Sequence, residues 1–209
     1  MQLVGLKGYS RYSDSKAFTL EEINRMDEAV VALNRVKEAD ELEKVCEKIR
    51  HEHVVLNELA AISRVSGKKK VTVSVGMNAL NREDIRLYEE LGAYAVVIPP
   101  ELNHEVDGLK SKSLKIEVFG RAFVEMFYKG KCMLSAYSSG RSVKRDGECG
   151  MECARRWKVI YNGRAVAEVT FRPRLMHFSV DADLVKHETR QITKVGVMEY
   201  GAHNGNSQS

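Results

Sequence analysis

The stretch from residue 71 to residue 98 contains one complete strand–helix–strand unit. It opens with Val71-Thr72-Val73-Ser74-Val75, continues with a helix that Asn81 caps and Gly92 ends, and closes with Tyr94-Ala95-Val96-Val97-Ile98. Runs rich in Val and Ile without polar alternation are typical of strands buried on both faces of a parallel sheet. The stretch therefore predicts a right-handed βαβ unit.

The same unit recurs along the first two thirds of the chain. Further strands are predicted at residues 3–6, 29–34, 54–57 and 116–119. Between them, Thr19-Leu20-Glu21-Glu22 is a capping box that begins a helix to about Asp27, and Leu59 to Val65 form a short helix. Five or six such units are too few for a complete barrel of eight strand–helix units. The predicted fold class is α/β, an incomplete TIM-like (β/α) barrel, either truncated or an open half-barrel.

A polar residue follows each of five predicted strands, at intervals of 23, 21, 23 and 20 residues: Asn34, Asn57, Asn78, Glu101 and Arg121. Ligands of parallel α/β folds bind at the carboxyl ends of the strands, where the loops converge. We expect these five residues to line one substrate site that faces the cysteine-containing segment. The alternative is that they are ordinary turn and cap residues.

The sequence pattern changes after Phe119. Residues 1–120 form the βα-repeat domain, and residues 121–158 are a Gly-, Ser- and charge-rich block with three of the four cysteines. Residues 159–200 contain C-terminal strands, and residues 201–209 are a polar tail expected to be disordered. Asn162-Gly163 between two apolar runs predicts a β-hairpin. We therefore expect a small C-terminal β extension.

Composition and charge narrow the class of protein. A hydrophobic content of 44% over 209 residues excludes disorder throughout the chain. The apolar runs are too short to span a membrane, and residues 1–7 lack a signal-peptide pattern, so we expect a cytoplasmic protein. Net charge is +4, and residues 121–158 carry nine Lys or Arg against four acids. This basic block fits an anionic partner, either RNA or an acidic small molecule, or else a solvated charged loop.

The cysteines are candidates for metal ligands. Cys149 and Cys153 are close enough in sequence to hold one ion, and Cys132 could reach them through a loop. Thiolates select zinc, copper(I) or iron–sulfur clusters; three unrelated loop thiols are the alternative. Cys46 is the remaining candidate, but it shares an apolar helical stripe with Leu42, Val45 and Ile49, which also fits a buried structural thiol.

The cysteine block also resembles a known family. The matching segments are Gly130-Lys131-Cys132-Met133-Leu134-Ser135, Gly140-Arg141-Ser142, Arg145-Asp146-Gly147-Glu148-Cys149 and Glu152-Cys153-Ala154-Arg155. They are similar to the signature of the collagenase-like peptidases, unknown-type peptidase family 32, and the resemblance covers roughly residues 3–160. Arg141 and Arg155 lie inside this signature, so we expect both to face the site, where a guanidinium binds an anionic substrate or stabilises thiolates.

The resemblance implies a TIM-like barrel. Several relatives act in oxygen-independent hydroxylation of an RNA base or a ubiquinone precursor, and they hold an iron–sulfur cluster through four cysteines. The family's usual first cysteine falls near Glu125 in this chain. Cys46 or a non-cysteine group therefore replaces it, a partner chain of the same family supplies it, or the cluster is absent. The chain is also shorter than the family norm.

Two other functions stay open at this point. The family name implies a peptidase, although the sequence contains no Gly-x-Ser-x-Gly elbow, and His187-Glu188-Thr189-Arg190-Gln191 lacks the second histidine of a zinc-protease helix. A non-catalytic module is the other alternative, with the cysteines holding zinc and shaping an RNA- or protein-binding surface.

Overall fold

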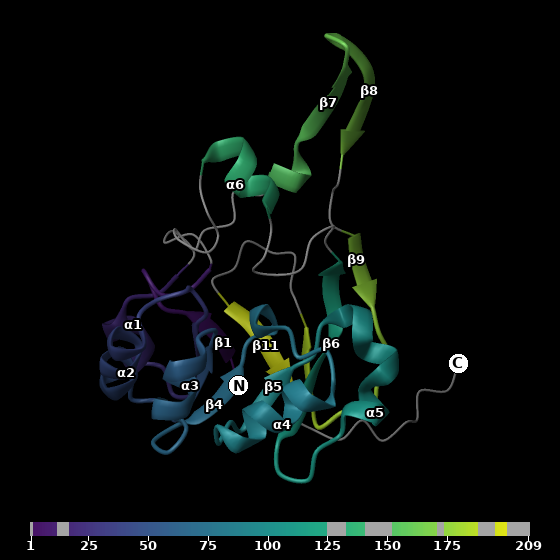
Figure 1. Ribbon diagram of the computed structural model, residues 1–209. Coiled ribbons are helices and arrows are strands. Elements are labelled where there is room, and N and C mark those ends of the chain that lie inside the picture. The colour runs from purple at the N-terminus through teal and green to yellow at the C-terminus, as the bar shows by residue number, and fades with distance from the viewer. Residues whose placement is uncertain are drawn as a thin grey trace.

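The computed structural model describes residues 2–11, 17–124, 133–140, 152–170, 174–187 and 195–199. Strands and helices alternate from β1 to β6 (Figure 1). The elements of this part are β1 (Gln2–Gly5), α1 (Leu20–Asn24), β2 (Ala29–Leu33), α2 (Ala39–Lys48), β3 (His53–Leu56), α3 (Leu59–Val65), β4 (Lys70–Val73), η2 (Val75–Met77), α4 (Arg82–Glu90), β5 (Ala95–Val97), η3 (Pro100–Glu105), α5 (Val106–Leu109) and β6 (Lys115–Val124).

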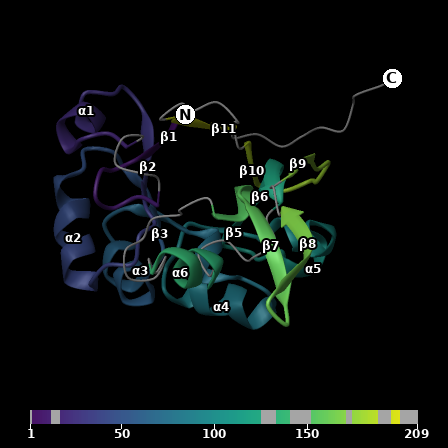
Figure 2. The ribbon, with the colours of Figure 1, turned by 90° about the horizontal axis from the view of Figure 1, so that it is seen from above.

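Strands β1 to β6 pair in parallel and in chain order. The helices α1 to α5 lie outside the curved sheet, as the view down onto it shows (Figure 2). The predicted parallel βαβ units are therefore confirmed. Because every strand in the series points the same way, all six carboxyl ends open toward one face of the molecule.

The C-terminal part of the chain closes the sheet. Its elements are α6 (Met133–Ser139), η4 (Glu152–Ala154), β7 (Arg156–Tyr161), β8 (Arg164–Thr170), β9 (Arg174–His177), β10 (Leu184–His187) and β11 (Val195–Glu199). Strand β10 pairs in parallel with β6, and β11 pairs antiparallel with both β10 and β1. The predicted incomplete TIM-like barrel is confirmed, with β10 and β11 in place of the last two βα units.

The main core lies between the outer face of the sheet and the helices. Alternate strand residues, such as Val31, Val54 and Val71, point outward and pack there against helix residues such as Leu42 and Ile62. All five are fully buried. The strand residues between them face the barrel interior, where Val30 and Val55 form a separate small cluster. Strands buried on both faces explain why the sequence runs are apolar without alternation.

Local capping chemistry sets the helix ends. The side chain of Thr19 accepts from the Glu22 backbone N–H at 3.2 Å in a capping box, as the sequence predicts. Asn81 accepts from Glu83 and Asp84 at the start of α4, and Gly92 follows that helix with φ +77°. Glycine adopts the left-handed conformation at the end of a helix more easily than any other residue.

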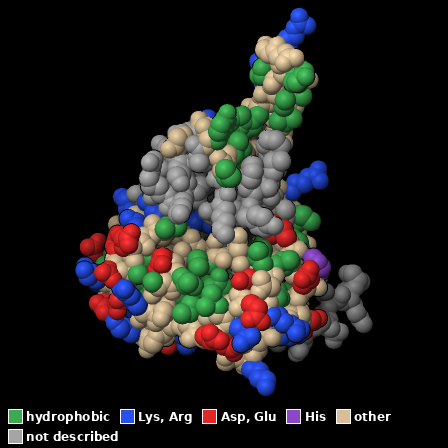
Figure 3. Space-filling view, viewed as in Figure 1, with side chains coloured by type: hydrophobic (Ala, Val, Ile, Leu, Met, Phe, Trp, Pro, Cys, Tyr) green, Lys and Arg blue, Asp and Glu red, His purple; other side chains and the backbone are tan. Residues whose placement is uncertain are grey.

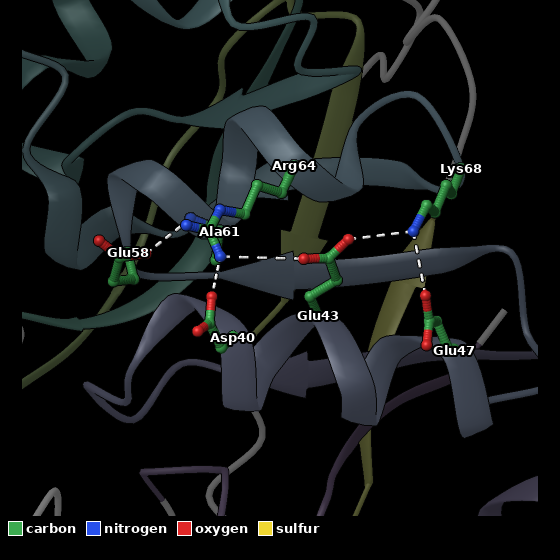
Figure 4. A network of polar contacts seen from close by, with 7 residues as sticks. All are labelled: Asp40, Glu43, Glu47, Glu58, Ala61, Arg64 and Lys68. Carbon is green, nitrogen blue, oxygen red and sulfur yellow. Dashed lines mark hydrogen bonds and ion pairs between the residues drawn. The ribbon is translucent and has the colours of Figure 1, made fainter.

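Helices α2 and α3 are joined by surface ion pairs (Figure 4). Lys68 lies 3.0 Å from both Glu43 and Glu47 of α2, and Arg64 pairs with Asp40. Four of these side chains are exposed, and that of Glu43 is half-buried. Exposed pairs of this kind contribute little each, so the core beneath them dominates the packing of α2 on α3.

The predicted hairpin is formed by β7 and β8 and stands away from the barrel (Figures 1 and 3). Its turn residues Asn162 and Gly163 have φ +47° and +72°, the values of a type I′ turn. Exposed hydrophobic side chains include Ile160, Tyr161 and Val166. No helix within the described ranges is long and apolar enough to cross a membrane.

Candidate functional site

The register of the parallel strands sets a row of side chains across the barrel interior. Leu33 pairs with Leu56, and Leu56 with Val73, so the next residues, Asn34, Asn57 and Ser74, face inward side by side. Val97 pairs with Glu117 on the continuation of this row. The row lies toward the carboxyl ends of the strands. The structure thus places two of the predicted asparagines in the same layer of the barrel as Glu117, a residue that the strand-end pattern does not select.

Asn34 organises the loop after β1. Its Oδ1 accepts from the backbone N–H of Arg11 at 2.8 Å, and the neighbouring Arg35 donates through Nε to the Ser10 carbonyl at 3.1 Å. Asn34 therefore performs loop-fixing chemistry, the alternative that the sequence analysis left open. Asn78 ends η2 in the left-handed conformation, with φ +53°, which is also a turn role.

Asn57 has a different environment. Its Oδ1 is buried and has no hydrogen-bond partner among the described residues. Gly76 leaves room for this side chain, since a Cβ at position 76 would lie 2.5 Å from Asn57 Oδ1. A glycine at this close approach allows the amide to occupy the interior row.

The two remaining strand-end candidates are more peripheral. Glu101 is exposed on η3, and the buried polar side chain of that helix is Asn103, which donates through Nδ2 to the Phe119 carbonyl at 3.2 Å. Arg121 is half-buried on β6 beyond a bulge, and its neighbour Ala122 is the residue that packs with the inward-facing Phe119. All five candidates follow strands toward one end of the sheet, while only Asn34 and Asn57 belong to the interior row.

Glu117 and Lys186 form a buried ion pair inside the barrel. Oε1 of Glu117 lies 3.0 Å from Nζ of Lys186, and the two side chains are 1% and 12% exposed. The Lys186 ammonium also lies 4.4 Å from the centroid of the Phe119 ring. A signal for Glu117 was present, because a carboxylate in the apolar run Ile116 to Phe119 is unusual for a buried strand. No comparable signal existed for Lys186.

A second interior contact lies nearer the amino ends of the strands. Nε2 of His53 is 2.7 Å from Oγ1 of Thr72, and both residues are buried. Burial, together with the smaller effect of the positive charge of Lys70, lowers the pKa of His53 to about 4. His53 is therefore neutral at pH 7, as expected for an imidazole in a poorly hydrated interior.

Cys153 is half-buried on η4, which packs against α6, and α6 lies beyond the carboxyl ends of the strands (Figure 1). Arg155 was expected to face the site, but its side chain is 69% exposed and pairs through Nε with Glu152 at 3.2 Å. The partner carboxylate of Glu152 is buried, so the ion pair holds the guanidinium beside η4.

Cys46 lies in the core between α2 and the sheet and is 2% exposed. Burial raises the pKa of its thiol to about 12, so the thiolate that metals require is disfavoured. The structure thus favours the buried structural thiol over a metal ligand at this position.

Cys132, Cys149 and Arg141, like the tail 201–209, lie outside the described residues. Within the described ranges, no three His, Cys, Asp or Glu side chains are grouped as a metal site.

Comparison with known proteins gives three results. The model of peptidase family U32 matches residues 3–199. The tRNA hydroxylation protein P of Escherichia coli (strain K12) is 29% identical over 91 residues, which are 42% of this chain and 19% of that protein. The matched region therefore spans about a fifth of that relative. The solved U32 peptidase Mk0906 aligns with a TM-score of 0.48 and 14% identity, covering 58% of this chain and 61% of that chain.

Proposed function

Because the chain belongs to peptidase family U32, we propose that it acts in oxygen-independent hydroxylation of an RNA base. The observation that carries this proposal is the 29% identity to a tRNA hydroxylation protein. The basic charge of residues 121–158 supports a polyanionic substrate such as tRNA. A protein with this substrate would work in the cytoplasm.

We further propose an iron–sulfur cluster held by Cys132, Cys149 and Cys153. Thiolates are the normal ligands of such clusters. The neutral, buried thiol of Cys46 does not fit this ligand set. The fourth ligand is then a non-cysteine group of this chain or a residue of a partner chain. When bound, the cluster supplies one-electron redox chemistry; zinc at the same cysteines is the alternative.

The residues of the barrel would bind and orient the base. Asn57 and Glu117 face the interior near the carboxyl ends, and Arg121 follows Glu117 by four residues on β6, beyond a bulge in that strand. Amide and carboxylate oxygens fix the orientation of a planar base by hydrogen bonds, and a guanidinium attracts phosphate. The described elements α6 and η4, which follow β6 in the chain, lie on the carboxyl-end side of the barrel (Figure 1).

Peptide hydrolysis is the alternative that the family name carries. The buried histidines give it little support, since Nε2 of His51 donates to the Ile23 carbonyl at 2.8 Å and Nε2 of His53 engages Thr72. A general base for a serine or cysteine nucleophile needs that nitrogen within hydrogen-bond reach of the nucleophile. We therefore favour hydroxylation.

Anaerobic purification of the full chain, followed by iron and acid-labile sulfide analysis, tests the cofactor. We expect a brown protein whose iron is lost in Cys153→Ser and retained in Cys46→Ser, the matched control. Equal iron in both variants would contradict the ligand assignment. Zinc in place of iron would support the binding-module alternative.

The substrate is tested in a bacterial strain that lacks its own tRNA hydroxylation protein. We expect expression of this chain, with its partner chain if one is required, to restore a hydroxylated tRNA nucleoside detected by mass spectrometry. If expression instead restores quinone synthesis and leaves tRNA unchanged, the substrate is a quinone precursor and not tRNA. Release of peptides from a collagen-like substrate by the cluster-free protein would favour the peptidase.

A further inference from the structure

One oxygen of Glu117 lacks a partner in the barrel interior. Oε1 faces Lys186, whereas Oε2 is buried and accepts no hydrogen bond from any residue in the part of the chain that the structure describes. A buried carboxylate oxygen that has lost water without gaining a donor is unfavourable. This orphaned acceptor points to a group that is brought into the barrel from outside.

Fold stability does not account for the ion pair. Desolvation of two buried charges offsets most of their attraction, and apolar residues of similar size serve a barrel interior as well or better. The neighbouring inward positions on these strands follow that rule, since Phe119 of β6 and Leu184 of β10 are buried and apolar. A charged pair among these apolar side chains is the arrangement expected where a polar ligand is bound.

The interior row offers a second acceptor of the same kind. Oδ1 of Asn57 is also buried without a partner among the described residues, and it lies on the row that contains Glu117. The ammonium of Lys186 in the interior is already engaged by Glu117 and by the Phe119 ring. Glu117 Oε2 and Asn57 Oδ1 are thus two acceptors that a ligand with hydrogen-bond donors would satisfy, whereas Arg11 Nε is a buried donor without a partner among the described residues.

We propose that Glu117 Oε2 accepts a hydrogen bond from the ring N–H of a nucleobase that enters from the carboxyl ends of the strands. Lys186 is a positioning residue, because its ammonium holds Oε1 and so directs Oε2 toward the base. Carboxylates recognise N–H donors on base edges in other nucleic-acid complexes. The inference rests on the proposed function, in that an RNA base is the substrate, and names the residue that orients it.

Binding of free nucleosides to the full chain tests the assignment by saturation-transfer NMR. Uridine and guanosine have a ring N–H, which 3-methyluridine and 1-methylguanosine lack. We expect at least one parent nucleoside to bind and its methylated form to bind roughly tenfold to a hundredfold more weakly. This comparison uses the unmodified protein, so it does not depend on the folding of any variant. Equal binding of both forms would overturn the inference.

The substitution Glu117→Gln should weaken binding of the parent nucleoside by the same factor. It should also abolish the protein's preference for the parent nucleoside over its methylated form. Glu52→Gln is the matched control, because Glu52 also pairs with a lysine, Lys70 at 2.9 Å, but on the surface. It should bind as the parent protein does. Unchanged nucleoside preference in Glu117→Gln, with an unchanged melting temperature, would refute the role of Glu117.

The outcomes separate this inference from the proposed function. If tRNA is hydroxylated in cells but nucleoside binding ignores Glu117, the inference fails and the function stands. If nucleoside binding depends on Glu117 but no hydroxylated tRNA forms, the inference stands and the function fails. Binding of a small peptide amide such as N-acetylglycinamide, without binding of any nucleoside, would overturn the nucleobase as the ligand.

Discussion

The buried imidazole of His53 should make the stability of the barrel depend on pH in a defined window. In the folded protein its pKa is lowered to about 4, whereas the ordinary value is 6.5. As pH falls below about 6.5, the unfolded chain binds a proton at this residue and the folded chain does not. The free energy of unfolding must therefore decrease as pH falls, until the folded pKa is reached.

The magnitude follows from the two pKa values. Each pH unit between them is worth about 1.4 kcal/mol, so the full separation corresponds to about 3 kcal/mol. Most of the loss should occur between about pH 6.5 and pH 4.5, before the folded imidazole begins to take up its own proton. The side chain is 5% exposed, so solvent screening reduces this figure little.

Urea unfolding at a series of pH values measures the effect. His53→Gln removes the titrating group and should flatten the pH dependence by about 3 kcal/mol relative to the parent protein. His104→Gln is the control, because His104 is on the surface with a side chain that is 73% exposed. If the parent and His53→Gln lose stability equally between pH 7 and pH 4.5, the imidazole is not held neutral by burial, and the reasoning is wrong.

Three further substitutions test features of the fold and the interior row. Asn81→Ala removes the cap of α4 and should lower the free energy of unfolding by about 1 kcal/mol in urea titrations; no change would mean that water replaces the cap. Gly76→Ala places a Cβ 2.5 Å from Asn57 Oδ1 and should destabilise the protein by roughly 1–3 kcal/mol through overpacking. An unchanged melting temperature would show that the amide moves aside freely. Lys186→Met strands the Glu117 charge and should cost roughly 3–5 kcal/mol. Adding Glu117→Gln to Lys186→Met should recover most of that loss in the free energy of unfolding. If the losses of the two single variants simply add in the double variant, the two side chains are not coupled.

Much of the barrel could be predicted because its signals are local. The apolar runs, the capping residues Thr19 and Asn81, and the Asn162-Gly163 turn each depend on neighbours within a few residues, and the structure confirms all of them. The candidate site was predicted less completely. The strand-end rule found Asn34 and Asn57, and it also selected Glu101, which is exposed, because the rule places a residue at an edge without giving the direction of its side chain.

The sequence by itself determined that the chain forms parallel βαβ units, since hydrophobic period, capping and turn chemistry act over short distances. Only the tertiary structure decided how the ring of strands is completed. β10 and β11 reach β6 and β1 across a long separation in sequence, and no local pattern encodes that pairing. The same closure brings Lys186 to Glu117, and the burial it produces sets the pKa values of His53 and Cys46. Contact and desolvation depend on the assembled neighbourhood of a group, which the linear order of residues does not specify.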